Sequence, residues 1–145
     1  MRTFPDHIAE VREEERGFAA SVHLLNLIPF WGIFFAVGVW LYFKERSRPV
    51  VFHAQQAILF QSVFLAASFV WLLGEMLLKI VMVLNPDLAL FLSKSNFILL
   101  IVCYGFYALL CVIGTFGTLM GRSFLYPLIG RRVLEGALSK PVARD

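Results

Sequence analysis

The stretch Pro49–Gly74, PVVFHAQQAILFQSVFLAASFVWLLG, decides the fold, because its 26 residues contain no Asp, Glu, Lys or Arg. Two further stretches, Gly17–Phe43 and Ser95–Gly121, have 27 residues each and are equally free of these charges. An α-helix rises 1.5 Å per residue, so about 20 apolar residues cross a hydrocarbon core about 30 Å thick. Each stretch is therefore long enough to cross a bilayer.

The composition agrees with a membrane protein. Hydrophobic residues make up 59% of the 145, against about 45–50% in soluble globular chains. The spans and their connections use nearly the whole chain, which leaves no room for a separate catalytic domain. We therefore expect no enzyme, no cofactor and no metal site. The net charge of +3 is small, so nucleic-acid binding is not expected either.

Pro29 lies near the middle of the first stretch, where it removes a backbone hydrogen bond and clashes with the preceding turn. Two interpretations follow. The stretch is one bent span, about 18–43, or a re-entrant pair of half-helices, Phe18–Ile28 and Phe30–Phe43. A re-entrant pair needs a well-covered bundle interior, because broken backbone at membrane depth must find hydrogen-bond partners. The bent span is the favoured interpretation.

The second span is predicted over Val50–Leu84 and ends at the breaker Asn85-Pro86-Asp87. Leu88–Leu92 is expected to form a short interfacial segment capped by Asp87. Ser95 or Asn96 is then placed to cap a third span, Phe97–Met120.

Both ends of the chain are predicted to be separate segments. Residues 1–17 are acidic and suit a surface helix from about Pro5 to Arg16. Residues 122–145 are basic and amphipathic, which favours a helix on the membrane surface. Together with the bundle over 18–121, these segments predict an all-α membrane protein of three transmembrane helices, the first kinked or re-entrant at Pro29.

Basic residues suggest the orientation. If the first stretch spans once, one side of the membrane receives eight: Lys44, Arg46, Arg48, Arg122, Arg131, Arg132, Lys140 and Arg144. The other side receives five: Arg2, Arg12, Arg16, Lys79 and Lys94. The positive-inside rule then places the C-terminus in the cytoplasm of a bacterial inner membrane.

Polar side chains recur along the second span at helical spacing. One seam of this helix contains Gln61, Ser68 and Glu75, and such a seam should face protein rather than lipid. Glu75 and Lys79 are four residues apart, the spacing of a helical ion pair. We favour a neutralised ion pair near the membrane interface. The alternative is a polar path for ions.

Two further polar residues, His53 and Gln56, crowd the start of the same helix with Gln61. Such side chains hydrogen-bond between helices or to broken backbone, such as that around Pro29, and this structural role is favoured over catalysis. His23 is interpreted as an interhelical hydrogen-bond donor, with Asn26 as the candidate partner, rather than as a proton relay.

Small residues predict close helix packing in the third span, where Gly114 and Thr118, and Gly117 and Gly121, are four positions apart. Packing within the chain is the default, and a homo-oligomer is possible. The aromatic residues, the four tyrosines included, are interpreted chiefly as lipid-facing bulk and interfacial anchors.

Three segments together carry a family resemblance: His23–Gly32 (HLLNLIPFWG), Arg48–Ala57 (RPVVFHAQQA) and Gly121–Leu128 (GRSFLYPL). They resemble the Tic-twenty-like family of small multi-pass membrane proteins. That family includes a bacterial membrane domain of unknown function, the chloroplast inner-envelope import component and magnetosome MamF-type proteins. The resemblance implies a helical bundle that acts in assembly, scaffolding or translocation, and it implies no catalytic residues.

The leading functional hypothesis is a non-enzymatic accessory or scaffold subunit that docks on other membrane-protein subunits. The alternative is an oligomeric channel or translocase-like conduit, because three helices alone leave no aqueous lumen. In both cases the lipid bilayer is the first partner.

Overall fold

A computed structural model describes residues 11–122, 124–127 and 129–138. Its elements are a 3-10 turn, η2 (Glu13–Glu15), and five α-helices. These helices are α1 (Arg16–Leu25), α2 (Trp31–Phe43), α3 (Arg48–Leu84), α4 (Pro86–Leu119) and α5 (Ile129–Leu138). The described part is thus all-helical, as predicted. The proposed N-terminal helix from Pro5 falls largely outside the described residues.

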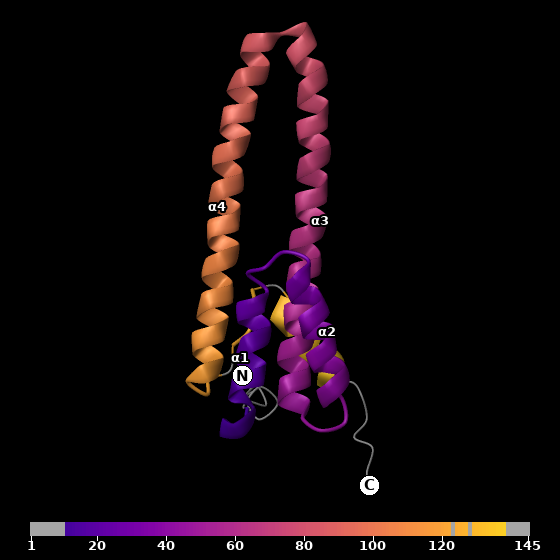
Figure 1. The fold of residues 1–145 in the computed structure, drawn as a ribbon, viewed down its shortest axis with the longest axis vertical. Coiled ribbons are helices and arrows are strands. Elements are labelled where there is room, and N and C mark those ends of the chain that lie inside the picture. Colours follow the sequence, from indigo (N-terminus) through magenta and orange to yellow (C-terminus); the bar gives the residue numbers. More distant parts are fainter. Residues whose placement is uncertain (1–10, 123, 128, 139–145) are drawn as a thin grey trace.

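The first hydrophobic stretch is not one bent helix. It forms α1 and α2, which run in opposite directions beside the lower half of α3 (Figure 1). The chain reverses between them, where Phe30 has φ 66° and ψ −52° and the Trp31 amide donates to the Pro29 carbonyl at 2.9 Å. This is a γ-turn, a tight and strained reversal. The favoured single span is therefore wrong, and the half-helix interpretation agrees with the structure.

Two helices of the described chain, α3 and α4, are long and apolar enough to cross a membrane. They form a hairpin whose upper half rises beyond α1 and α2 (Figure 1). The first predicted span, about 18–43, does not form a crossing helix, because α1 and α2 have only 10 and 13 residues. At 1.5 Å per residue these helices are about 15 and 20 Å long, too short to cross alone.

The fourth helix is continuous from Pro86, so the predicted break before Phe97 is wrong. Asn85 supplies the cap: its side-chain oxygen accepts a hydrogen bond from the Leu88 amide at 3.1 Å, and Pro86 occupies the first turn. Ser95 does not cap a helix, because its hydroxyl donates to the Phe91 carbonyl one turn earlier. Helices α3 and α4 are thus connected by the single residue Asn85.

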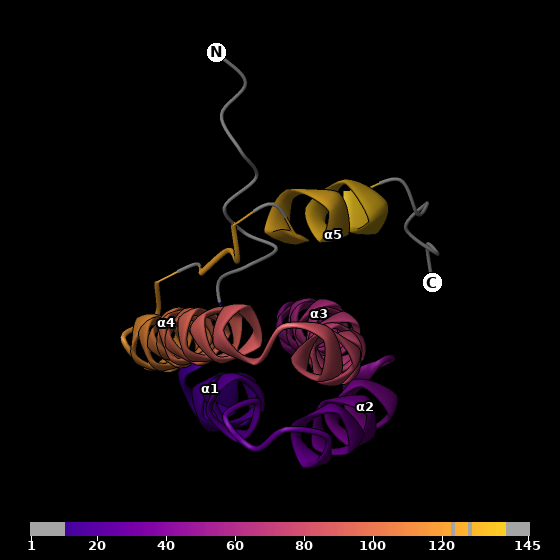
Figure 2. The same cartoon turned by 90° about the horizontal axis from the view of Figure 1, so that it is seen from above.

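The core lies where α1 and α2 meet the first turns of α3. It consists mainly of small and β-branched side chains, among them Ala19, Ala36, Ala54 and Ala57. Small side chains allow helix backbones to approach closely. Figure 2 shows α1 and α2 on one face of the α3–α4 hairpin and α5 on the opposite face.

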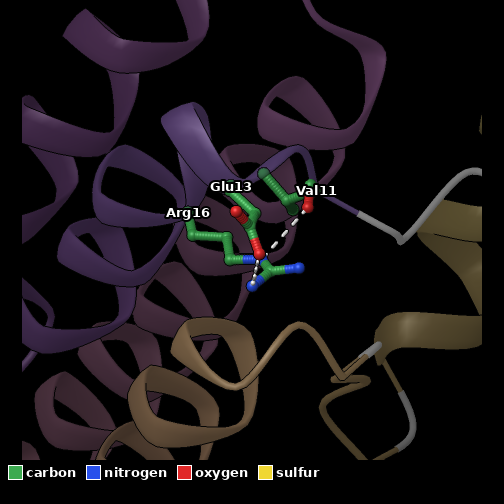
Figure 3. A network of polar contacts seen from close by, with 3 residues as sticks. All are labelled: Val11, Glu13 and Arg16. Atoms are coloured by element: carbon green, nitrogen blue, oxygen red, sulfur yellow. Dashed lines mark hydrogen bonds and ion pairs between the residues drawn. The ribbon is translucent and has the colours of Figure 1, made fainter.

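Arg16 holds the entrance of α1 against the end of α4. Its guanidinium lies within 3.4 Å of both the Val11 carbonyl and a Glu13 carboxylate oxygen (Figure 3). Gly121 ends α4 with φ 73°, and a β-carbon there would lie 2.8 Å from an Arg16 nitrogen. The left-handed conformation of Gly121 therefore requires glycine, whereas the Arg16 guanidinium is the end of a flexible side chain and can move.

Candidate functional site

The first half of α3 meets the end of α1 in a group of polar side chains that we call the buried polar cluster. None is more than 3% exposed. Its members are His23, Asn26, His53, Gln56, Gln61, Tyr107 and Tyr126. The structure thus brings together three of the residues singled out in the second span, and adds two tyrosines.

Two histidines and a tyrosine form the centre of the cluster. His23 Nε2 lies 3.0 Å from His53 Nδ1, and His23 Nδ1 lies 2.9 Å from the Tyr126 hydroxyl oxygen. His23 was expected against Asn26, but both of its ring nitrogens are used by these two partners. His23 therefore joins α1, α3 and the segment after α4 at one point.

The turn after α1 breaks the helical hydrogen bonds, and other helices replace them. Its three successive carbonyls, of Asn26, Leu27 and Ile28, each accept a side-chain hydrogen bond. The donors are the Tyr107 hydroxyl at 2.7 Å, the Tyr104 hydroxyl at 3.2 Å and Gln61 Nε2 at 3.1 Å, respectively. Such carbonyls must be paired within protein if the turn lies in lipid. The expectation that Gln61 pairs with broken backbone near Pro29 agrees with this geometry.

Asn26 also anchors the turn in the other direction. Its side-chain Nδ2 donates to the Ala57 carbonyl of α3 at 3.0 Å. Gln61 lies about 13 residues after Arg48, so the turn is held about 20 Å along α3 from the start of that helix. When α3 enters the membrane near Arg48, this depth lies within the bilayer.

Gln56 fixes the segment that returns from α4. Its Oε1 accepts from the Tyr126 amide at 3.1 Å, and its Nε2 donates to the Phe124 carbonyl at 3.3 Å. The Tyr126 ring stacks on Phe60 with 3.9 Å between the ring centroids. Burial raises the pKa of the Tyr126 hydroxyl, so this group stays protonated and available to hydrogen-bond His23.

The upper polar residues of α3 lie apart from the cluster. Ser68 donates to its own helix, at the Phe64 carbonyl. Glu75 accepts a hydrogen bond from the Asn96 side chain of α4. Within the described chain Glu75 forms no ion pair with Lys79, which is exposed. The predicted pair is therefore not formed, because the hairpin places an amide donor beside the carboxylate.

The small residues of α4 pack within the chain. A β-carbon on Gly114 would lie 2.9 Å from the Phe124 ring and 3.3 Å from His23, and one on Gly117 would lie 3.7 Å from Phe124. Thr118 is buried, and its hydroxyl donates to the Gly114 carbonyl at 2.8 Å. These positions hold α1 and the returning segment against α4, which is the default interpretation of the small-residue pattern.

Tyr107 and Tyr126 were missed as members of the site, because they were grouped with the interfacial anchors. Both are buried in the bundle, and both hydroxyls bond to protein. One signal was available for Tyr107, which lies three residues after Tyr104 and so shares a helix face with it. No local signal marked the group to which either hydroxyl binds, the Asn26 carbonyl for Tyr107 and the His23 ring for Tyr126.

The cluster is a hydrogen-bonding device, and its side chains bind one another and the backbone. In the described part of the chain no group of three or more His, Cys, Asp or Glu residues could hold a metal ion. Cys111 is buried and Cys103 is exposed on the same helix, and both are free thiols. The role supported by this geometry is the fixing of the α1–α2 turn and of the segment that returns from α4.

Comparison with known proteins adds the family. No curated protein and no solved structure matches the chain significantly. Residues 14–133 match the MamF and MmsF family model, described as the magnetosome magnetite crystal formation protein family. The match covers α1 to α4 and the first half of α5, and it confirms the magnetosome part of the resemblance; the wider Tic-twenty-like grouping stays a prediction. Since the matched segment is far more than half of the sequence, the chain belongs to the magnetosome magnetite crystal formation protein family.

Proposed function

We propose that this protein is a non-enzymatic membrane subunit that supports magnetite crystal formation by assembling with other membrane proteins. Membership of the magnetosome family and two long apolar helices support a membrane-associated accessory role. The observation that carries the finer proposal is the upper half of the α3–α4 hairpin, where most apolar side chains of both helices are exposed.

The hairpin is longer than a bilayer needs. Its 37-residue helix α3 measures about 55 Å, against a hydrocarbon core of about 30 Å. Near the turn, Val83 and Leu84 are 84% and 81% exposed. If α3 enters the membrane near Arg48, this tip projects beyond the lipid on the far side. An apolar projection of this kind favours contact with another subunit.

The polar residues support a structural rather than a catalytic role. Those of the buried polar cluster are used to hold the α1–α2 turn and the segment around Tyr126. A hydrogen-bonded interior and an apolar exterior suit a scaffold, which acts by binding other proteins through its surface.

The experiment is replacement of the chromosomal copy in a magnetite-forming host by the double variant Val83→Ser/Leu84→Ser. We expect smaller or fewer magnetite crystals by electron microscopy, with the variant still in the membrane fraction, because the tip contacts would be lost. Leu41→Ser/Tyr42→Ser is the matched control on the exposed face of α2, and it should leave the crystals unchanged.

Purification of both forms in mild detergent completes the test. The wild type should carry defined companion membrane proteins in fixed ratio, and the tip variant should lose them. Unchanged crystals and unchanged companions in the tip variant would contradict the proposal. A closed ring of this chain alone would instead support the conduit alternative.

A further inference from the structure

The face of the hairpin that bears α5 contains a groove of about 660 Å³ between α3 and α4. Its walls come from Leu59 to Ala67 of α3 and from Cys103 to Leu110 of α4, and its lower end is bounded by Pro127, Ile129 and Arg132. The volume is within the range of small-molecule sites, about 300–1,000 Å³. The groove is therefore large enough to hold a ligand along the helix axes.

The floor of this groove is aromatic and fixed. Phe60 and Tyr107 stack with 5.0 Å between centroids, and Phe64 stacks on Tyr107 at 3.9 Å. Tyr107 is also held by its hydrogen bond to the Asn26 carbonyl. The rims are apolar and exposed, with Val63 on one side and Phe106 on the other. A flexible alkyl chain fits a preformed apolar channel of this kind.

The charge of the groove lies at one end only. Arg132 of α5 is exposed and bounds the groove, and Arg131 precedes it in the same helix. In the described chain neither arginine is paired with a carboxylate. A guanidinium can bind phosphate with two parallel hydrogen bonds. The groove thus combines an apolar channel with an anion-binding end.

The position of α5 matches the edge of a bilayer. Its second residue, Gly130, lies against the Gln56 side chain of α3. Glu75, the carboxylate of α3, lies about 19 residues after Gln56, or about 28 Å along the helix. That interval is close to the hydrocarbon thickness. Arg132 is therefore placed at the level of phospholipid headgroups, with the groove running from it toward the acyl region.

A second cavity on the hairpin offers an internal comparison. It has about 630 Å³ and is lined by the α1–α2 turn at Pro29 and Phe30 and by α3 and α4, and its polar side-chain groups are the hydroxyls of Ser68 and Tyr104. No basic residue bounds it, so it lacks an anion-binding end. Charge complementarity therefore distinguishes the first groove.

We propose that the groove between α3 and α4 binds one anionic phospholipid, with an acyl chain over Phe60 and Tyr107 and the headgroup phosphate on Arg132. This site requires the chain to lie in a membrane, but it does not depend on docking to other subunits. A phospholipid held here would fix α5 against the hairpin at the membrane surface.

The test uses the full-length protein in mild detergent, with dioleoyl phosphatidylglycerol and dioleoyl phosphatidylcholine added in equal amounts. Native mass spectrometry counts the lipids that remain bound. We expect one phosphatidylglycerol per chain, retained at least about tenfold over phosphatidylcholine, because the choline ammonium beside the same phosphate would be repelled by Arg131 and Arg132. Arg132→Gln should abolish this preference, and Arg132→Lys should restore most of it. Arg122→Gln, an exposed arginine that does not line the groove, is the matched control and should keep the preference.

Blocking the channel gives a second measurement. Val63→Trp should reduce retention of both lipids, whereas Leu65→Trp, which lines the second cavity, should leave phosphatidylglycerol bound. Millimolar inorganic phosphate should not displace the lipid, because phosphate alone lacks the apolar part. The proposal is overturned if Arg132→Gln keeps the preference, if Arg122→Gln loses it equally, or if phosphate displaces the lipid. It is also overturned if Val63→Trp dissociates a dimer instead of releasing lipid.

Discussion

At the scale of single residues, the fold depends on polar groups that pair inside an apolar bundle. His23 is the clearest case, because each of its ring nitrogens has a partner from a different part of the chain. Removing one partner from a buried pair leaves the other unsatisfied, at a cost of about 1–3 kcal/mol. Point substitutions in the cluster should therefore act through stability.

Tyr126→Phe tests this at one atom. The substitution keeps the ring stacked on Phe60 and removes only the hydroxyl that bonds His23. We expect the free energy of unfolding in detergent micelles to fall by about 2 kcal/mol. Tyr42→Phe removes a hydroxyl from an exposed ring and should change it by less than about 0.5 kcal/mol. Equal effects of the two variants, measured by reversible denaturation, would contradict the role of the cluster.

A close approach at Gly32 controls how α2 packs. A β-carbon there would lie 2.4 Å from the Leu25 carbonyl oxygen and 2.8 Å from Gln61 Oε1. We expect Gly32→Ala to lower the free energy of unfolding by about 3 kcal/mol, because backbone has to move. Gly38→Ala, in the same helix with open space around it, should raise it by up to about 1 kcal/mol through helix propensity. A stable Gly32→Ala protein would show that α1 and α2 are not held this closely.

At the scale of elements, the hairpin turn between α3 and α4 depends on Asn85. Its side chain caps α4 at the Leu88 amide, whereas the Ser95 hydroxyl only bonds back to its own helix. We expect Asn85→Ala to lower the free energy of unfolding by about 1 kcal/mol. Ser95→Ala should have almost no effect. The reverse order, in the same denaturation experiment, would mean that a helix begins near Asn96 after all.

The elements also show how far sequence reasoning reaches. The span predicted from Val50 to Leu84 differs from α3 by two residues at its start, because apolar content and the Asn85-Pro86 breaker are local signals. Pro29 likewise located the break in the first stretch. Whether the chain bends or reverses there depends on distant partners: Gln61, Tyr104 and Tyr107 replace the lost backbone bonds.

For the buried polar cluster, too, local signals were read correctly from the sequence and distant partners were not. His53, Gln56 and Gln61 were found because polar residues in an apolar helix are conspicuous. Tyr126 was not, because a tyrosine near the end of a span resembles an interfacial anchor until its hydroxyl partner is known. The extra helical turns that make α4 continuous were also missed, since Ser95 and Asn96 suit a cap equally well by residue type.

At the scale of the whole molecule, the reversal at Pro29 changes which ends share a side of the membrane. A single first span would put the start of α1 and α5 on opposite sides, whereas the reversal between α1 and α2 would return both to one side. In the described chain that end then carries eight basic residues: Arg12, Arg16, Lys44, Arg46, Arg48, Arg122, Arg131 and Arg132. Only Lys79 and Lys94 lie toward the hairpin turn. Over the same described residues the three-span arrangement gives six basic residues against four. The positive-inside rule therefore favours a cytoplasmic location for α5 and the start of α1 more strongly when the chain reverses at Pro29.

Single cysteines can test this topology, in a background of Cys103→Ala and Cys111→Ala. Glu14, Asp87 and Glu135 are exposed positions in η2, at the hairpin turn and in α5. We expect a membrane-impermeant maleimide to label Asp87→Cys in intact spheroplasts, and to label Glu14→Cys and Glu135→Cys only after the membrane is opened. A mixed result, with Glu14→Cys labelled from outside and Glu135→Cys protected, would restore the three-span arrangement. It would also contradict the reversal between α1 and α2, because a first stretch that crosses the membrane once ends on the opposite side from its start. The carbonyls of Asn26 to Ile28 would then need other hydrogen-bond partners than those of the α1–α2 turn.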